Sequence, residues 1–303
     1  MKETPANIPA SILARLKNLA QKENLDFNFL LLRYIQERFL SRLAASRYVN
    51  NFVLKGGLLL LAYNIGRARP TRDIDFQGID ISSDRTDLEL FVKDIVSVDL
   101  GDGVSFRPES IQSAVIKENA AYEGVRIKLT AKIGSARNVI QLDFAFGDAV
   151  SSHPLEMDYP TLLSEEGVRI LAYSKETIVA EKFEAIVKLA SFNSRMKDFH
   201  DLSFLLSEFD FDGRTLQTAI RTTFQHRNTS IRSAVELLNS DLGSAPGFQR
   251  QWDAFKKKTR LSGARDFKGV FDDIGSFLAP VLMTELEGRP MNRFWRRADR
   301  KWE

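Results

Sequence analysis

The sequence predicts a mixed α/β domain over residues 1–165, followed by a mostly α-helical domain over residues 166–303. Three observations predict this fold class. The chain has 303 residues, a length typical of about two domains. In its first half, short alternating apolar segments that are typical of strands lie between helical patterns. From Lys175 onward the apolar spacing is almost wholly helical.

The first domain is expected to begin with two helices, over residues 8–22 and 27–48, because their apolar residues recur at helical spacing. The next expected elements are a strand over 52–54, a helix from the glycines to residue 64, a strand over 73–76, a helix over 86–98, and strands over 104–107, 124–133 and 138–144. The last two strands are predicted to form a hairpin around residues 134–137. Residues 153–160 are expected to be a connecting loop, and 168–172 a short apolar segment.

The second domain is expected to begin with a helix over residues 176–189, which Ser174 caps. Another helix is expected over 198–206. Further helical patterns cover residues 214–225, 230–240, 248–258 and 267–287. No internal repeat and no low-complexity tract interrupts the sequence.

The amino-acid composition limits which metal ions the chain can bind. Hydrophobic residues make up 44% and charged residues 27% of the chain, with a net charge of +3, which is ordinary globular composition. The chain has no cysteine and three histidines, so any metal must be held mainly by carboxylates, which favours Mg²⁺ or Mn²⁺. No signal peptide and no membrane-spanning segment is apparent, so a cytoplasmic location is expected.

Two carboxylates stand out at Asp73 and Asp75. On a strand, residues two apart point to the same face, so their like charges would repel unless a cation lies between them. Asp143, in a second alternating strand, could add a third carboxylate as a metal ligand or as a general base. The alternative is a solvated strand edge, because Asp-x-Asp alone is common.

The segment Lys55-Gly56-Gly57 precedes these carboxylates, at the junction of a strand and a helix. Glycines let the backbone approach a phosphate, and a helix N-terminus favours an anion. The alternative for two glycines is a plain tight turn. The order strand, Gly-Gly, helix, loop and Asp-x-Asp strand is far more specific than either part, and it indicates a nucleotide-phosphate site.

This order of strands, helix and motifs resembles the nucleotidyltransferase fold of polymerase-β-like enzymes, which is a mixed sheet with flanking helices. More closely, it resembles the AbiEii/MenT-type nucleotidyltransferase toxins of bacterial toxin–antitoxin systems. The segments that carry the resemblance are 52–57, 71–76, 180–186 and 197–202. One departure is that many nucleotidyltransferases have Gly-Ser where this chain has Gly56-Gly57, so a backbone amide must replace the hydroxyl.

The resemblance implies roles for residues far along the chain. It implies that Lys182 contacts the nucleotide, whereas its place at the border of an apolar stripe would also suit a lysine that reaches solvent. It favours Asp198 as the active-site carboxylate and Asp201 as a supporting residue. The alternative for these two aspartates is a surface ion-pair cluster.

Two residues beside Asp73 have expected roles as well. The resemblance implies that Thr71 is a site of regulatory phosphorylation when an antitoxin silences the enzyme, although a capping threonine is the alternative. Arg72, together with Lys55, Gly56 and Gly57, is expected to bind the NTP. The alternative for Arg72 is a solvent-facing charge.

The resemblance thus implies a Mg²⁺- or Mn²⁺-dependent toxin that transfers nucleotides from NTP to RNA, with the 3′ end of tRNA as acceptor, and so stops translation. It also implies a cognate antitoxin, and no membrane partner is expected. Two alternatives stay open: a nucleotidyltransferase that modifies a small molecule, and a non-catalytic module that binds NTP or RNA.

Basic and aromatic residues alternate in the C-terminal segment 289–303. Such a surface can bind phosphates while its aromatic rings stack on unpaired bases. The alternative is that Phe294, Trp295 and Trp302 pack onto the helical domain and that the arginines are solvated.

Overall fold

The computed structural model describes residues 7–63, 71–119, 122–147, 154–189, 195–259 and 265–303. The chain divides into two compact units, which we call the sheet unit (Met1–Ala62, Pro70–Gly147 and Pro154–Ala172) and the helical unit (Tyr63–Arg69, Asp148–His153 and Tyr173–Glu303). This division lies after Ala172, later than the predicted boundary at residue 165. The reason is that β7 (Val168–Ala172) pairs in parallel with β1 (Phe52–Lys55), so this strand belongs to the sheet.

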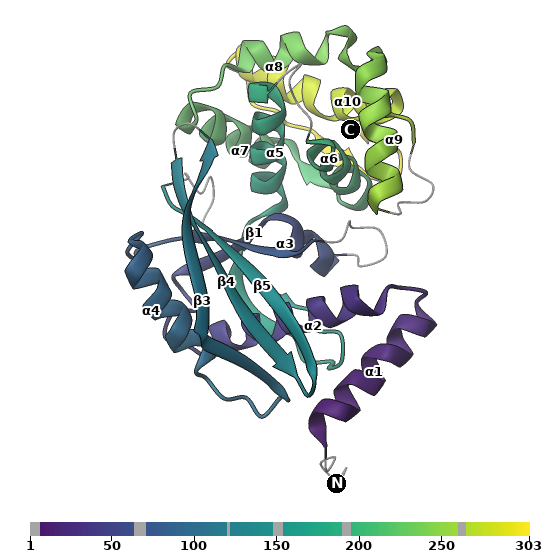
Figure 1. Cartoon of the computed structure of the whole chain (residues 1–303). Coiled ribbons are helices and arrows are strands. Elements are labelled where there is room, and N and C mark those ends of the chain that lie inside the picture. Colours follow the sequence, from purple (N-terminus) through teal and green to yellow (C-terminus); the bar gives the residue numbers. More distant parts are fainter. Residues whose placement is uncertain (1–6, 64–70, 120–121, 148–153, 190–194, 260–264) are drawn as a thin grey trace. The chain divides into compact units, whose positions relative to one another are not determined.

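The sheet unit contains a mixed sheet with helices on its flanks (Figure 1). Its helices are α1 (Ile8–Lys22), α2 (Phe27–Ala44), α3 (Gly56–Tyr63) and α4 (Arg85–Val96). Its other strands are β2 (Asp73–Gly78), β3 (Val104–Asn119), β4 (Tyr122–Ile133), β5 (Ala136–Ala145) and β6 (Leu155–Tyr159). The seven strands have the order β3-β4-β5-β2-β1-β7-β6. β2 is central, parallel to β5 and antiparallel to β1.

The two faces of the central strands differ in character. Phe76 of β2 stacks on Phe144 of β5 and packs against Phe39 of α2, so one face forms the core. Asp75 and Asp143 directly precede these two phenylalanines on their strands, and therefore point to the opposite face. Alternation of apolar and polar residues thus separates the packed face from the face that carries the carboxylates.

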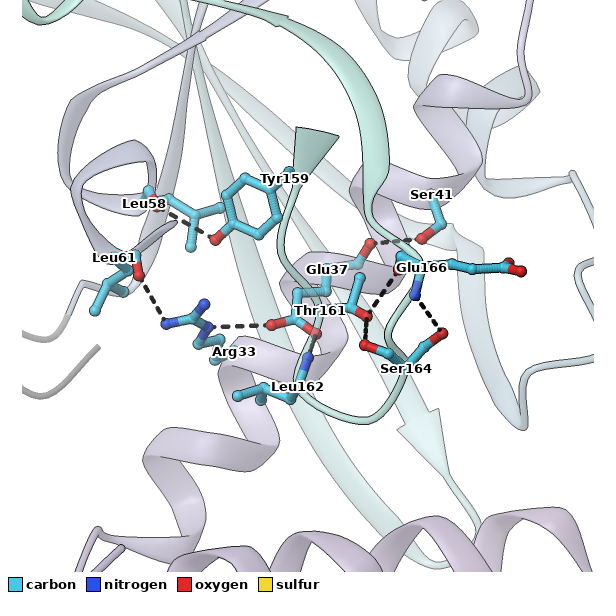
Figure 2. A network of polar contacts seen from close by, with 10 residues as sticks. All are labelled: Arg33, Glu37, Ser41, Leu58, Leu61, Tyr159, Thr161, Leu162, Ser164 and Glu166. Atoms are coloured by element: carbon cyan, nitrogen blue, oxygen red, sulfur yellow. Dashed lines mark hydrogen bonds and ion pairs between the residues drawn. The ribbon is translucent and has the colours of Figure 1, made fainter. Parts of the chain in front are cut away.

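A buried ion pair connects α2 to helix α3 and to the loop after β6 (Figure 2). Arg33 Nε donates to Glu37 Oε1 at 3.1 Å, and Arg33 Nη1 donates to the carbonyl of Leu61, near the end of α3. The backbone N–H of Leu162, just after β6, donates to Glu37 Oε2 at 2.9 Å. Burial raises the pKa of Glu37 to about 7, although the charge of Arg33 acts in the opposite direction.

Two strands differ from the prediction. β3 extends to Asn119 rather than ending at residue 107, and its pairing with β4 shifts in register between Arg107 and Gln112. Pro108, which cannot donate to a ladder, lies within this irregularity. The described part of the segment predicted as a loop, from residue 154 onward, contains strand β6, which pairs only with β7 at the sheet edge.

The helical unit begins with α5 (Lys175–Leu189) and α6 (Met196–Glu208). It continues with α7 (Gly213–His226), α8 (Ile231–Leu238), a 3₁₀ turn (Asp241–Ser244), α9 (Pro246–Thr259) and α10 (Phe267–Leu286). The predicted helices are therefore present, with ends that differ by a few residues. Among the described helices, none has both the length and the hydropathy that a membrane span requires.

The C-terminal segment completes the helical unit with a small sheet of β8 (Phe211–Asp212), β9 (Phe294–Arg296) and β10 (Lys301–Trp302). Trp295 is 1% exposed, and its indole N–H donates to the carbonyl of Leu206. Trp302 stacks on Phe277 and donates to the carbonyl of that residue. Both tryptophans therefore pack within the unit, as the packing alternative predicted, whereas Phe294, the third aromatic residue of that alternative, is 50% exposed.

Candidate active site

Three carboxylates meet on the polar face of the sheet unit. Asp73 and Asp75 lie on β2, and Asp143 lies directly opposite Asp75 on the parallel strand β5. Each contributes one oxygen to a group whose members all lie within 4.8 Å of one another. Three hard oxygen donors at this spacing suit a divalent cation such as Mg²⁺. The sequence-based grouping of these aspartates thus corresponds to a real cluster.

Basic residues flank the cluster along one row of the sheet. In the strand register, Lys55 of β1 is opposite Asp75, and Arg126 of β4 is opposite Asp143. Lys55 is buried. The row Lys55, Asp75, Asp143, Arg126 therefore carries two acidic residues between two basic ones. This arrangement partly offsets the repulsion between the carboxylates.

Gly56 is a position where only glycine fits. Its φ is +71°, in the left-handed region that L side chains rarely adopt. A Cβ at this position would overlap the Oδ2 atom of Asp75. Gly57 follows it, buried, in the first turn of α3. The glycines thus let the start of a helix approach the carboxylate cluster, an arrangement that favours an anionic ligand.

Thr71 and Arg72 precede β2. Thr71 is buried, and its hydroxyl donates a hydrogen bond to Asp73 Oδ1. Arg72 is exposed to solvent. The Thr71 hydroxyl therefore orients one of the three carboxylates, and Arg72 lies close to the cluster in sequence.

The second group of predicted residues lies within the helical unit. Lys182 of α5 has its Nζ 2.6 Å from Asp201 Oδ2 and 3.3 Å from Asp198 Oδ1, both on α6. Arg195 Nε lies 2.9 Å from the other oxygen of Asp198. Both aspartates are buried, so this is not the solvated ion-pair cluster of the alternative interpretation. Asp201 holds the lysine at the shorter distance.

Sequence reasoning missed Arg126. Its Nε donates to Asp143 Oδ1 at 2.8 Å, and its Nη2 donates to Oδ2 at 2.7 Å. These hydrogen bonds raise the pKa of Arg126, and the charges of Asp73 and Asp75 act in the same direction. The predicted hairpin could not reveal this contact, because a loop over residues 134–137 pairs Ile133 with Asn138 and places Arg126 opposite Ala145. In the structure Ile133 pairs with Ala136, and this tighter turn brings Arg126 opposite Asp143.

One family model and several solved structures match the chain. A family model described as "Nucleotidyl transferase AbiEii toxin, Type IV TA system" matches residues 38–273. Among solved structures, the chain is similar to JHP933 from Helicobacter pylori, with 18% identity, 87% of this chain and 95% of that chain covered, and a TM-score of 0.46.

A second solved structure with similarity to the chain is described as an antigenic nucleotidyltransferase-like protein from Paracoccidioides brasiliensis. Its identity is 14%, with 68% of this chain and 92% of that chain covered, and its TM-score is 0.37. No curated protein matches the chain.

Proposed function

Because this chain belongs to the AbiEii family of nucleotidyltransferase toxins, which form type IV toxin–antitoxin systems, we propose that it transfers nucleotides from an NTP to RNA. The proposed acceptor is the 3′ end of tRNA, whose modification stops translation. The observation that carries the proposal is the cluster of Asp73, Asp75 and Asp143 beside the glycine-led start of α3. Membership of the family makes the protein a nucleotidyltransferase. What we propose beyond it is the acceptor, the 3′ end of tRNA.

The donor set supports Mg²⁺ or Mn²⁺ as the cofactor. Asp73, Asp75 and Asp143 offer three carboxylate oxygens within 4.8 Å of one another, and the chain has no cysteine to favour a softer metal. When bound, the ion supplies positive charge that aligns the triphosphate and stabilises the charge that develops during phosphoryl transfer. Asp143 is either the third ligand or the base that accepts the proton of the attacking hydroxyl.

The phosphates of the NTP are proposed to bind at Lys55, Gly56, Gly57 and Arg72. The backbone amides at the start of α3 are the natural donors, because the first two residues of this helix, Gly56 and Gly57, carry no side chains that would cover them. The attacking hydroxyl displaces pyrophosphate in line.

In the helical unit, Lys182 is proposed to neutralise phosphate charge. Asp198 is proposed as the active-site carboxylate and Asp201 as its support. The buried contacts of Lys182 support a fixed orientation for its ammonium group.

A cognate antitoxin is proposed to silence the enzyme through phosphorylation of Thr71. The Thr71 hydroxyl is bonded to Asp73, so a phosphate on it would place about two negative charges beside the carboxylates. Both cation binding and NTP binding would then be opposed by charge and bulk. The burial of Thr71 means that a kinase would first have to gain access to this hydroxyl.

Incubation of the full chain with Mg²⁺, each labelled NTP in turn and total tRNA tests the proposal. We expect label on tRNA at its 3′ end. Label on a small molecule in a cell extract, with none on RNA, would favour the small-molecule alternative. NTP binding without transfer to any acceptor would favour a non-catalytic module. The intact carboxylate cluster argues against that last outcome.

A further inference from the structure

Arg126 lies at the edge of the carboxylate cluster but has no role in the proposed function. It extends from β4, and its guanidinium forms a fork with both oxygens of Asp143, at 2.8 and 2.7 Å. Its side chain is 37% exposed, whereas that of Asp143 is 8% exposed. A planar, bidentate contact of this kind fixes the orientation of a carboxylate more strictly than one hydrogen bond does.

The remaining contacts of Asp143 show which of its atoms is open to a ligand. Oδ2 accepts from Arg126 Nη2 and also from Gln141 Nε2, at 3.2 Å. Within the described residues, Oδ1 accepts only from Arg126 Nε. Each carboxylate oxygen has two lone pairs, so Oδ1 keeps one that the fork does not use. Arg126 can therefore hold Asp143 in place without preventing a cation from binding to it.

Electrostatics adds a second role. Without a cation, three carboxylates within 4.8 Å of one another repel strongly. The hydrogen bonds to Asp143, and to a lesser extent the charges of Asp143, Asp73 and Asp75, raise the pKa of Arg126, so its positive charge interacts with the whole cluster. Next to Arg126 in the strand register, β3 carries Ala114, which offers no competing charge. Arg126 thus supplies the positive charge on this side of the cluster.

We propose that Arg126 is a positioning residue for the metal-binding carboxylates, which orients Asp143 and offsets the charge of the cluster while no cation is bound. This inference rests on the proposed metal-dependent transfer. It predicts that loss of the arginine charge harms the metal-free protein more than the metal-loaded protein, because a bound cation supplies the missing charge itself. A purely structural residue would contribute equally in both states.

Thermal unfolding of the full chain, in EDTA and in saturating Mn²⁺, tests this prediction. The variant Arg126→Met keeps much of the side-chain length but removes the charge. We expect Arg126→Met to have a lower Tm than wild type in EDTA. When Mn²⁺ is added, the Tm of this variant should rise more than that of wild type. The matched control is Arg107→Met on β3, which loses an ion pair to Glu109 away from the cluster. Its rise with Mn²⁺ should equal that of wild type.

Arg126→Lys separates charge from orientation, because lysine keeps the charge but lacks the planar fork. We expect its rise in Tm with Mn²⁺ to equal that of wild type, and its kcat at saturating metal to fall about tenfold to a hundredfold. If Arg126→Met does not fold even with Mn²⁺, this lysine variant decides the question. An unchanged kcat, or a rise in Tm as large as that expected of the methionine variant, overturns the proposal.

The outcomes distinguish this inference from the proposed function. If Mn²⁺ stabilises wild type and Arg126→Met by the same increment, the role of Arg126 is wrong and the metal site stands. If Mn²⁺ does not stabilise wild type, the metal dependence of the proposed function is wrong, and the role of Arg126 fails with it.

Discussion

Among single residues, Gly56 places the strictest demand on the sequence, because its backbone has a φ of +71° and its Cα lies against the Asp75 carboxylate. Asp73, Asp75 and Asp143 each contribute one carboxylate oxygen to the cluster. Gly56 must have no side chain at all. Single-residue changes at these positions should therefore separate chemistry from folding.

Gly56→Ala is expected to lose more stability and more transfer activity than an alanine substitution at another left-handed glycine. A left-handed alanine costs about 1–2 kcal/mol, and here the added methyl would also displace Asp75. Gly101→Ala is the matched control, since Gly101 has a φ of +60° and nothing within 4 Å of an added Cβ. Chemical denaturation and NTP-transfer rates measure both effects. Equal losses of stability in the two variants would contradict this account.

Asp73→Asn is expected to reduce transfer by at least about a hundredfold, because a lost metal ligand removes several kcal/mol of transition-state stabilisation. Its Tm in EDTA should be equal to or higher than that of wild type, since one of three neighbouring like charges is gone. The control is Asp158→Asn on β6, an exposed carboxylate paired with Arg169. Wild-type transfer by Asp73→Asn would show that the cluster is not the catalytic site.

At the scale of elements, buried polar contacts join two helices to each other and to a loop. α2 is joined through Arg33 and Glu37 to the end of α3 and to the loop after β6 (Figure 2). α3 starts at the glycines of the site and ends at this network. The position of the phosphate-binding helix start therefore depends on contacts one helix length away.

Glu37 makes stability depend on pH. Burial raises its pKa from 4.5 to about 7 in the folded protein, so between these values the native state binds more protons than the unfolded state. The contribution of Glu37 to the free energy of unfolding is therefore fully present below about pH 4.5. It is lost as the pH rises to about 7, which lowers the free energy of unfolding by up to about 3 kcal/mol. Glu37→Gln should flatten this part of the curve of unfolding free energy against pH.

The control for this experiment is Glu109→Gln, which changes an exposed glutamate. Its curve should keep the wild-type slope between pH 4.5 and 7. The comparison concerns slopes rather than absolute stability, because glutamine in place of Glu37 can satisfy Arg33 or Leu162 but not both. Parallel curves for Glu37→Gln and wild type would show that Glu37 titrates normally.

The C-terminal strands allow a second test at this scale. Trp295→Ala is expected to destabilise the protein by about 3–5 kcal/mol, because the indole is fully buried and hydrogen-bonded. Phe294→Ala is the neighbouring control, with a side chain that is 50% exposed. It should change stability by less than about 1 kcal/mol. Similar values for the two variants would contradict the packing of this segment.

At the scale of the whole molecule, each unit carries its own group of charged residues. The sheet unit carries the carboxylate cluster, and the helical unit carries Lys182 with its two buried aspartates. Family membership covers residues 38–273 and therefore spans both groups. Activity is accordingly expected to depend on residues of both units.

Lys182→Ala is expected to abolish transfer, as Asp73→Asn does. It should also lower Tm, because the buried Asp201 would lose the ammonium group 2.6 Å from it, while the buried Asp198 would keep only its ion pair with Arg195. Lys188→Ala, on the exposed side of the same helix, is the control and should leave both properties unchanged. The increment in Tm that Mn²⁺ causes should survive in Lys182→Ala. Normal transfer by a folded Lys182→Ala protein would remove this residue from the site.

The sequence by itself determined the features that depend on local backbone geometry. Strand alternation placed Asp73 and Asp75 on one face, the glycines marked the start of α3, and helical spacing identified the second unit. Tertiary structure alone decided which residues meet across strands and which side chains are buried. The fork from Arg126, the edge strand β6 and the burial of Trp295 all belong to this second class. They depend on register and long-range packing, which local periodicity does not encode.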